Sequence, residues 1–478
     1  MNTGLARVTI SAPERRVDVA LPEHVALAEL LPEVLRHAGV GLADDGERHG
    51  GWLLRRTDGV ALAPGQGLFP QGVRDGEVLH LVPARAQWPE LEYDDVVEAI
   101  ADGARRRGAA WSPASTRVAT LTAAGVLLAA GLVALLHQGP AWWGTAVVGL
   151  GVAVLLTLAA VVGSRAYGDA PAGAALGGYA LPYAFVGGAA LVAPGDPAGV
   201  LAPLAWLGGP ELLTGCTALL LVAVLGAVGV ASSVRVFAAG VVVGLLGAVA
   251  ALVSVFVPAG AAGAAAILLA ALVCGIGVLP LLAIRIGKLP MPPIALPTGT
   301  DTADGGSPTG AGPSEGAWQR PDPERVFTSV ARTEELLTGM LTGHAVLSVA
   351  ATVVLVAAGG TAGRVLVGVC AAALLLRSRL FVTVRQRVPL VGAGLAGLTV
   401  LAVALLWGAT GADLLILTIG VVVAALVTVV AGATYSQRPP SPYLGRAADI
   451  LDTVMVVSVV PVACAVLGLY ARARGLGA

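Results

Sequence analysis

Four carboxylates lie at the ends of long apolar segments, where an ion-coupled membrane protein could use them. Asp449 and Asp452 are three residues apart, so a helix through both would carry them on one face. Glu211 and Asp413 lie at the predicted outer ends of their own segments. Ionisable side chains inside a membrane often mark a proton or substrate path. Side chains at the end of a span are more often solvated or paired with lipid headgroups, and we interpret all four carboxylates in this way.

The sequence contains no convincing nucleotide-, phosphate- or metal-binding motif. Gly392, Gly394 and Gly397 have the spacing of a dinucleotide-binding loop, but they lie inside an apolar segment and follow no strand. Lys288 has no glycine-rich context for a phosphate loop, and the six histidines show no metal-ligand spacing. The sequence therefore predicts no catalytic, cofactor-binding or metal-binding residues, no cofactor and no enzyme activity.

The glycines and cysteines of the apolar segments are interpreted as packing residues. Small residues at helical spacing allow close approach of helices in membranes. A cysteine that lies alone in its segment has no partner for a metal site or a disulfide, so we expect a small buried hydrophobic side chain. The residues concerned are Gly173, Gly177, Gly240, Gly244, Gly247, Gly392, Gly394, Gly397, Cys216, Cys274, Cys370 and Cys464.

The first 84 residues predict a small α+β domain. Residues 7–10 and 16–19 alternate polar and apolar side chains, which predicts a hairpin. Apolar residues at helical spacing follow over 27–35, with Pro32 as a kink or a restart. Residues 52–55 and 77–82 predict two further strands. This order is that of a ubiquitin-like β-grasp domain.

The rest of the chain predicts an all-α polytopic membrane protein. Only 12% of the 478 residues are charged, about half the share typical of soluble proteins, and the deficit lies beyond Arg117. About eleven segments approach the roughly 20 apolar residues that a membrane-spanning helix needs. We predict spans at 118–136, 142–163, 171–193, 211–232, 236–257, 261–283, 338–358, 361–381, 388–408, 411–432 and 449–470.

Basic residues predict the orientation of these spans. Thirteen arginines and lysines lie in the gaps assigned to the cytoplasm, against three in the outer gaps and tail. Arginines 105–107, just before the first span, are interpreted as part of this positive-inside bias, not as a nucleic-acid site. We therefore predict a multi-pass protein of the bacterial inner membrane with a cytoplasmic N-terminus and an extracytoplasmic C-terminus.

The predicted domains follow from these patterns. They are a cytosolic ubiquitin-like domain (1–84), a basic linker (85–117), spans one to six (118–283), a partly disordered cytoplasmic loop (284–337) and spans seven to eleven (338–478). Residues 324–337 carry an apolar stripe that fits either an interfacial helix or a cytoplasmic extension of the seventh span.

This architecture resembles EccD, the polytopic membrane subunit of the type VII (ESX) secretion system of actinobacteria. The resemblance covers nearly the whole chain, and its most recognisable segments are 17–22 and 30–32, 75–81 at the last strand of the domain, and 285–293 in the loop. It implies a non-enzymatic scaffold or channel-complex subunit that dimerises in the lipid membrane. It also implies assembly with EccB, the ATPase EccC and EccE, with the ubiquitin-like domain docking cytosolic parts of these partners.

The alternative is a secondary transporter with a soluble regulatory domain. Against it, we interpret the apolar cores of the predicted spans as free of Asp, Glu, Lys, Arg and His.

Overall fold

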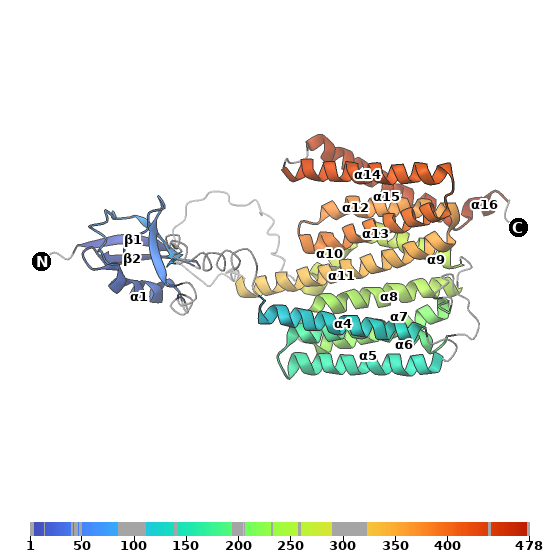
Figure 1. The fold of residues 1–478 in the computed structure, drawn as a ribbon, viewed down its shortest axis with the longest axis horizontal. Helices are drawn as coiled ribbons and strands as arrows, with labels where there is room; N and C mark the ends of the chain where they lie inside the picture. Colours follow the sequence, from blue (N-terminus) through green and yellow to red (C-terminus); the bar gives the residue numbers. More distant parts are fainter. Residues whose placement is uncertain are drawn as a thin grey trace, which may run out of the picture. The chain divides into compact units, whose positions relative to one another are not determined.

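The computed structural model describes residues 4–84 and 111–475, apart from residues 14, 40–41, 43–45, 47–49, 138–141, 194–203, 205, 231–232, 257–259, 289–322 and 438–440. The chain forms two compact units, Met1–Ser112 and Pro113–Ala478 (Figure 1). Most of the predicted linker (85–117) and most of the predicted loop (284–337) lie outside the described residues.

The N-terminal unit is a mixed four-stranded sheet with one helix. β1 (Leu5–Ser11) pairs antiparallel with β2 (Arg16–Pro22) and parallel with β4 (Val78–Pro83), and β4 pairs antiparallel with β3 (Trp52–Arg56). The strand order β2-β1-β4-β3 is that of a β-grasp sheet. The predicted ubiquitin-like domain is thus confirmed.

The core of this unit follows from the alternation of its strands. Val8 and Ile10 of β1 and Leu79 of β4 point to the same side and are almost fully buried. The helix α1 (Leu27–Ala38) packs on this face through Leu27 and Val34, and it continues through Pro32 without restarting.

A hydrogen-bonded ion pair joins the end of β3 to the start of β4. Nε of Arg56 lies 2.6 Å from Oε1 of Glu77, and the backbone N–H of Arg74 donates to Oε2 of Glu77 over 2.9 Å. Burial alone would raise the pKa of Glu77, but the hydrogen bonds from Arg56 and Arg74 outweigh it and hold this pKa below its ordinary value of 4.5.

We expect Glu77→Gln to lower the thermal unfolding midpoint of a 1–84 fragment by a few degrees at pH 7. Because the pKa of Glu77 is lower in the folded state, its stabilising contribution is present above pH 4.5 and is lost as the pH falls through the folded pKa. The difference between the wild-type and variant midpoints should therefore shrink from pH 7 to pH about 3. Calorimetry at several pH values measures it. Glu29→Gln, at an exposed position of α1, is the control, and an unchanged difference at low pH would contradict the assignment.

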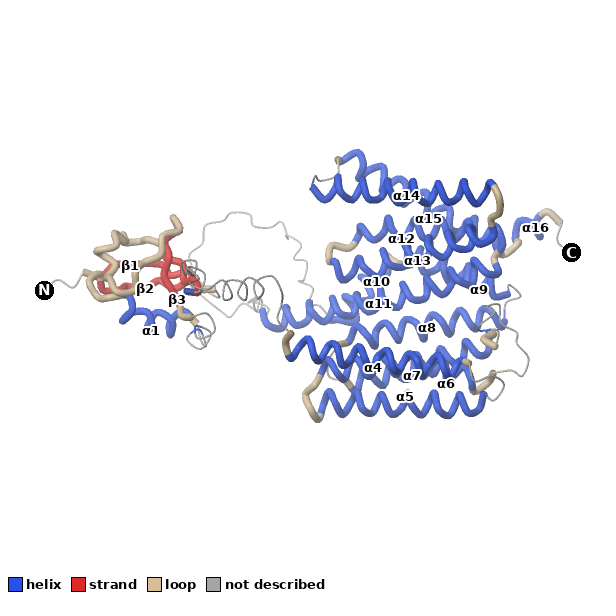
Figure 2. Tube along the Cα trace, in the orientation of Figure 1, coloured by secondary structure: helices blue, strands red, loops and turns tan. Residues whose placement is uncertain are grey.

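The second unit is a helical bundle (Figure 2). Its helices run mostly alongside one another, and most correspond one to one with the predicted spans. They are α4 (Pro113–Leu136), α5 (Trp142–Arg165), α6 (Ala170–Ala190), α7 (Gly209–Gly229), α8 (Val234–Phe256), α9 (Gly260–Gly275), α10 (Val278–Gly287), α11 (Pro323–Ala358), α12 (Gly360–Arg377), η3 (Ser378–Leu380), α13 (Val384–Gly408), α14 (Ala412–Gln437), α15 (Pro442–Val466) and α16 (Leu469–Ala473).

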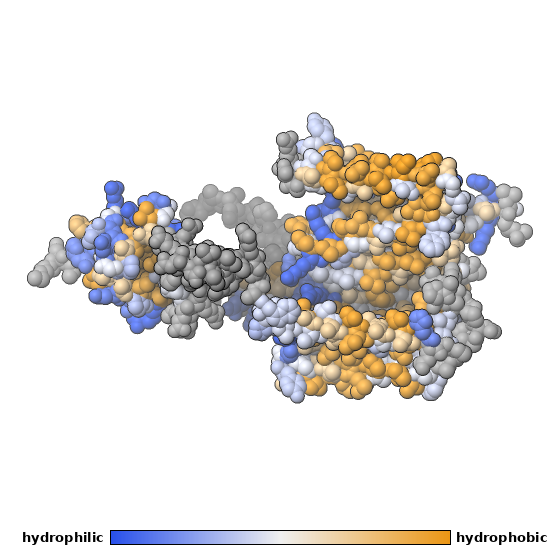
Figure 3. Space-filling model, viewed as in Figure 1, coloured by the Kyte–Doolittle hydropathy of each residue, from blue (hydrophilic) through white to orange (hydrophobic). Residues whose placement is uncertain are grey.

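Among the described residues, nine helices are long and apolar enough to cross a membrane, and ten if α9 and α10 form one bent span. The sides of the bundle are mainly hydrophobic and its ends carry the hydrophilic side chains (Figure 3). α6 occupies the place of the third predicted span but is not among these nine. It is rich in glycine and alanine and buries most of its surface against α5 and α7, so it needs few large lipid-facing side chains.

Two of the predicted spans, the sixth and the seventh, differ from the helices of the structure. The sixth span is broken between α9 and α10, which meet at 68°. Gly275, Gly277 and Pro280 cluster at this break, and a proline cannot donate the backbone hydrogen bond that would continue the helix. α11 is continuous from Pro323 to Ala358, so residues 324–337 extend the seventh span, and helix also occupies both ends of the predicted loop 284–337.

Glycines set the helix spacing at most of the positions predicted for them. A Cβ added to Gly394 of α13 would lie 2.7 Å from Leu375 of α12, and one added to Gly244 of α8 would lie 2.7 Å from Leu220 of α7. Gly173, Gly177, Gly240 and Gly247 have similarly close neighbours, and a Cβ on Gly397 would lie 3.2 Å from Ala371, which is less tight. Gly392 has none within 4 Å, so the packing interpretation is wrong for it.

Candidate functional site

The two carboxylates at the predicted outer ends have different surroundings. Glu211 is almost fully buried in the first turn of α7, and its Oε2 accepts a hydrogen bond from the backbone N–H of Gly208 over 2.9 Å. It therefore caps its own helix, and the predicted solvated state is wrong for it. Asp413 is exposed at the start of α14, where it lines a pocket of about 470 Å³ together with Arg364 of α12.

Asp449 and Asp452 lie on one face of α15, and each faces an arginine. Oδ1 of Asp452 is 3.5 Å from Nε of Arg377 at the end of α12, and Oδ1 of Asp449 is 3.5 Å from an Nη atom of Arg379 in η3. The side chain of Asp452 is 25% exposed and that of Asp449 is 77% exposed. The solvated interpretation therefore fits Asp449 and is wrong for Asp452.

Arg377 links three helices. Besides facing Asp452 of α15, it donates a hydrogen bond from an Nη atom to the carbonyl oxygen of Val273 over 2.8 Å. Val273 lies in the last turn of α9, where the break before α10 leaves carbonyls without helical partners. One guanidinium group thus satisfies one carbonyl at the end of α9 and lies between α9 and α15 at the end of α12.

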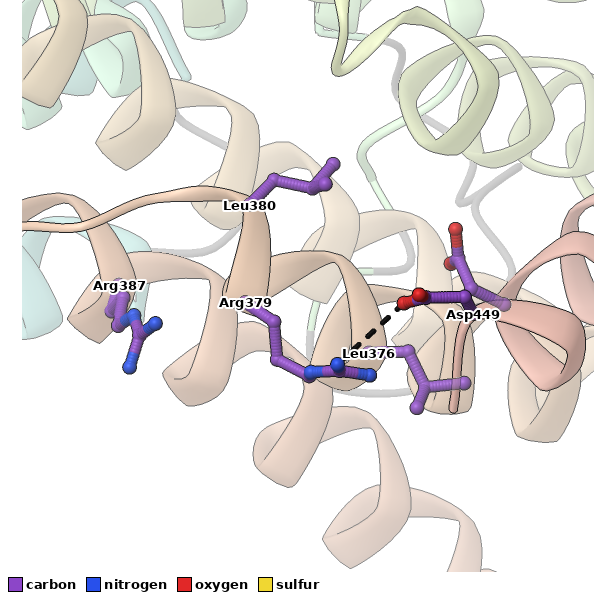
Figure 4. A pocket seen from close by; sticks show the side chains of 6 residues that line it. Leu376, Arg379, Leu380, Arg387 and Asp449 are labelled. Atoms are coloured by element: carbon purple, nitrogen blue, oxygen red, sulfur yellow. Dashed lines mark ion pairs between the residues drawn. The ribbon is translucent and has the colours of Figure 1, made fainter. Parts of the chain in front are cut away.

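A pocket of about 490 Å³ opens beside these ion pairs. We call it the arginine pocket, and it is lined by Leu376, Arg379, Leu380, Arg387, Asp449 and Asp452. Figure 4 shows Arg379 paired with Asp449, with Arg387 apart from both. Nε of Arg387 donates to the carbonyl oxygen of Phe381, and Arg387 forms no ion pair with any described residue.

Comparison with known protein families gives two matches that together follow this architecture. Residues 5–81 match the family of YukD, a protein of the WXG100 protein secretion system (Wss). Residues 116–476 match the EccD-like transmembrane domain, which is more than half of the chain. The chain belongs to the EccD family. The resemblance predicted from sequence is confirmed.

Individual relatives agree with this assignment. The ESX-4 secretion system protein eccD4 of Mycobacterium tuberculosis, in strains CDC 1551 and H37Rv, is 32% identical over 205 residues. That match spans 41% of this chain and 42% of eccD4, so the chain is aligned over less than half the length of its curated relatives.

Two solved structures share the fold of this EccD-family chain. A structure of protomer 1 of the ESX-3 core complex is similar with a TM-score of 0.56 and 21% identity, covering 98% of this chain and 99% of that one. A MycP5-free ESX-5 inner membrane complex is similar with a TM-score of 0.52 and 21% identity, covering 91% and 100%.

One buried ionisable residue of this EccD-family chain was not among the sequence candidates. His344 lies well inside α11, is 2% exposed, and its Nε2 has no hydrogen-bond partner among the described residues. Ser348 and Thr352 follow at helical spacing and are buried too, so the three form a polar stripe on α11. The interpretation that the apolar cores of the spans contain no histidine is therefore wrong, and the sequence itself shows this, because position 344 lies within the span predicted at 338–358.

The cysteines mostly follow the prediction. Cys216 and Cys370 are buried and Cys464 is half-buried. Cys274 is exposed on α9, so the buried interpretation is wrong for it; on a bundle with apolar sides, a thiol can face lipid as a small apolar group. In the part of the chain that the structure describes, no three His, Cys, Asp or Glu residues are grouped to hold a metal ion.

Proposed function

We propose that this chain is a non-enzymatic membrane subunit of a type VII (ESX) secretion system. The observation that supports this most directly is the EccD-like match over residues 116–476, preceded by a YukD-like domain at 5–81. In this proposal the chain dimerises in the membrane, and its ubiquitin-like domain docks cytosolic parts of partner subunits. The partners are EccB, the ATPase EccC and EccE.

The fold supports a scaffold role through its many fixed helix contacts. Buried side chains of α9, α11, α12, α13 and α15 form one continuous core, and α11 also packs on α8. α14 has no buried residue in its apolar stretch and, among the described residues, packs mainly against α13, which leaves lateral surface for lipid or another subunit. Most of the carboxylates of the candidate site form ion pairs or cap a helix, which favours a structural role over a catalytic one.

The experiment that tests this function is isolation of the protein from its native membrane in mild detergent. We expect the EccB-, EccC- and EccE-type subunits to co-purify with it, and deletion of the chain to abolish type VII export. Isolation of the chain without any of these subunits, from cells that contain them, would overturn the proposal.

The transporter alternative retains one specific observation, the buried His344 in α11. A buried ionisable group within a span is a feature of proton-coupled carriers. Proton flux measured with the purified chain in liposomes separates the two functions, because a scaffold subunit alone moves no protons. Sustained flux that requires His344 would favour the carrier.

We further propose that the N-terminus is cytoplasmic and the C-terminus extracytoplasmic, with the domain boundaries predicted above. Reporters fused after Arg107 and at Ala478 should report opposite sides of the membrane, because eleven predicted spans are an odd number of crossings and the arginine asymmetry favours a cytoplasmic N-terminus. Alkaline phosphatase and green fluorescent protein fusions measure this. Reporters on the same side would mean an even number of crossings.

A further inference from the structure

The arginine pocket is lined by two arginines and two aspartates, but one of these aspartates, Asp452, pairs with Arg377 outside the lining, which leaves one arginine of the pocket without a carboxylate. Arg377 and Arg379 each face an aspartate, whereas Arg387 has no carboxylate partner among the described residues. The hydrogen bond from its Nε to Phe381 fixes the guanidinium group and leaves the Nη atoms for another acceptor. An arginine held in this way, with its Nη atoms free to donate, is suited to bind a phosphate or carboxylate through two parallel hydrogen bonds.

The segment around the pocket is also unusually apolar for an exposed turn. Leu380, Val382, Val384 and Val388 are 66%, 91%, 74% and 59% exposed, and they run from the end of η3 into the first turns of α13, the same segment that carries Arg379 and Arg387. Isolated exposed aliphatic residues are common on proteins, but four of them within nine residues form a patch that water does not favour.

Arginines and exposed aliphatic side chains together match the two parts of a phospholipid. The guanidinium groups suit the headgroup phosphate, and the leucine and valine side chains suit the upper acyl chain. Basic pockets between transmembrane helices recognise anionic headgroups in this way. The pocket volume of about 490 Å³ lies within the range of roughly 300–1,000 Å³ that is usual for small-ligand sites.

We propose that the arginine pocket binds the phosphate of an anionic phospholipid, with Arg387 and Arg379 as its ligands and the Leu380–Val388 segment against its acyl chain. Asp449 holds Arg379 in place and limits the net charge, so that a single phosphate is accommodated and not a polyanion. A free phosphate ion would satisfy the arginines but would leave the aliphatic side chains uncovered, and therefore a lipid is the better occupant.

The test uses the full-length protein in detergent, titrated with phosphatidylglycerol or phosphatidylcholine and followed by native mass spectrometry. We expect a preference for phosphatidylglycerol that Arg387→Gln reduces about five- to tenfold. Arg387→Lys should retain part of the preference because it keeps the charge. The control is Arg472→Gln, which removes an exposed arginine from α16, far along the chain from the pocket. The thermal midpoint of each variant shows that it is folded.

A second arm separates the lipid from a free anion. Val382→Ser should weaken phosphatidylglycerol binding without changing the binding of inorganic phosphate. If Arg387→Gln leaves the lipid preference intact, the site is wrong. If inorganic phosphate at millimolar concentration displaces the lipid and Val382→Ser has no effect, the pocket holds a free anion and the lipid assignment is overturned.

Discussion

Gly226→Ala should destabilise the membrane bundle more than any other single methyl addition at an α7 glycine. A Cβ at this position would lie 2.1 Å from Cε1 of Phe237, which protrudes from α8 and is 1% exposed. The Phe237 ring cannot move away from α7, because it already lies against the backbone of Gly177 in α6. A Cβ added to Gly177 would lie only 2.6 Å from Cζ of the ring. Overpacking of this kind costs about 1–3 kcal/mol. The thermal unfolding midpoint of the protein in detergent should therefore fall by several degrees.

The control for this substitution is Gly420→Ala in α14. A Cβ at Gly420 meets no atom within 4 Å, and alanine is the better helix former, so the midpoint should stay or rise. Phe237→Leu combined with Gly226→Ala should recover part of the loss, because the smaller side chain leaves room for the methyl group. If Gly226→Ala alone matches the control, α7 and α8 are not packed around Phe237 as described.

Local patterns in the sequence were sufficient to predict the N-terminal domain. Alternation over 7–10 and 16–19 fixed which side chains face the core, and the register places Val8 opposite Val19. The parallel pairing of β1 with β4 joins residues about 70 positions apart, so only the order of elements indicated it. Span positions were predictable for the same reason, since apolar length determines what can cross a membrane.

The break in the sixth span coincides with a local sequence signal that apolar length does not reveal. Gly275, Gly277 and Pro280 weaken a helix locally, but the apolar run continues through them, and a hydropathy criterion sees only that run. Glycines and a proline are also tolerated within membrane helices. In the folded protein Arg377 from α12 donates a hydrogen bond to the carbonyl oxygen of Val273 beside the break, a tertiary contact that no local sequence pattern indicates.

The candidate site was predictable in part. Spacing alone indicated that Asp449 and Asp452 share a helix face, and both line the arginine pocket. Their partners lie about 70 residues earlier, at the end of another helix, and no local pattern links the two segments. The difference between an exposed Asp449 and a largely buried Asp452 also depends on that packing.

Asp452→Asn should lower the stability of the bundle by about 1–3 kcal/mol, less than the 3–5 kcal/mol typical of a fully buried pair. The side chains of Arg377 and Asp452 are 16% and 25% exposed, so water reaches them only in part, and removal of the carboxylate leaves a poorly solvated cation. Arg377 still holds Val273 of α9, and the loss should loosen the contacts among α9, α12 and α15. Thermal unfolding in detergent measures the loss, and Arg377→Gln combined with Asp452→Asn should cost less than the sum of the two single substitutions.

Asp449→Asn is the matched control, three residues away on the same helix face. Its carboxylate is 77% exposed, and exposed ion pairs contribute about 0–1 kcal/mol, so stability should change little.

The Asp449→Asn variant also distinguishes a scaffold subunit from a proton-coupled transporter. A scaffold subunit needs no proton at Asp449, so complex assembly, export and the dependence of export on the proton gradient should all persist. If Asp449→Asn assembles normally but uncouples export from the gradient, the carboxylate takes part in proton coupling, and the scaffold role would be wrong for this site.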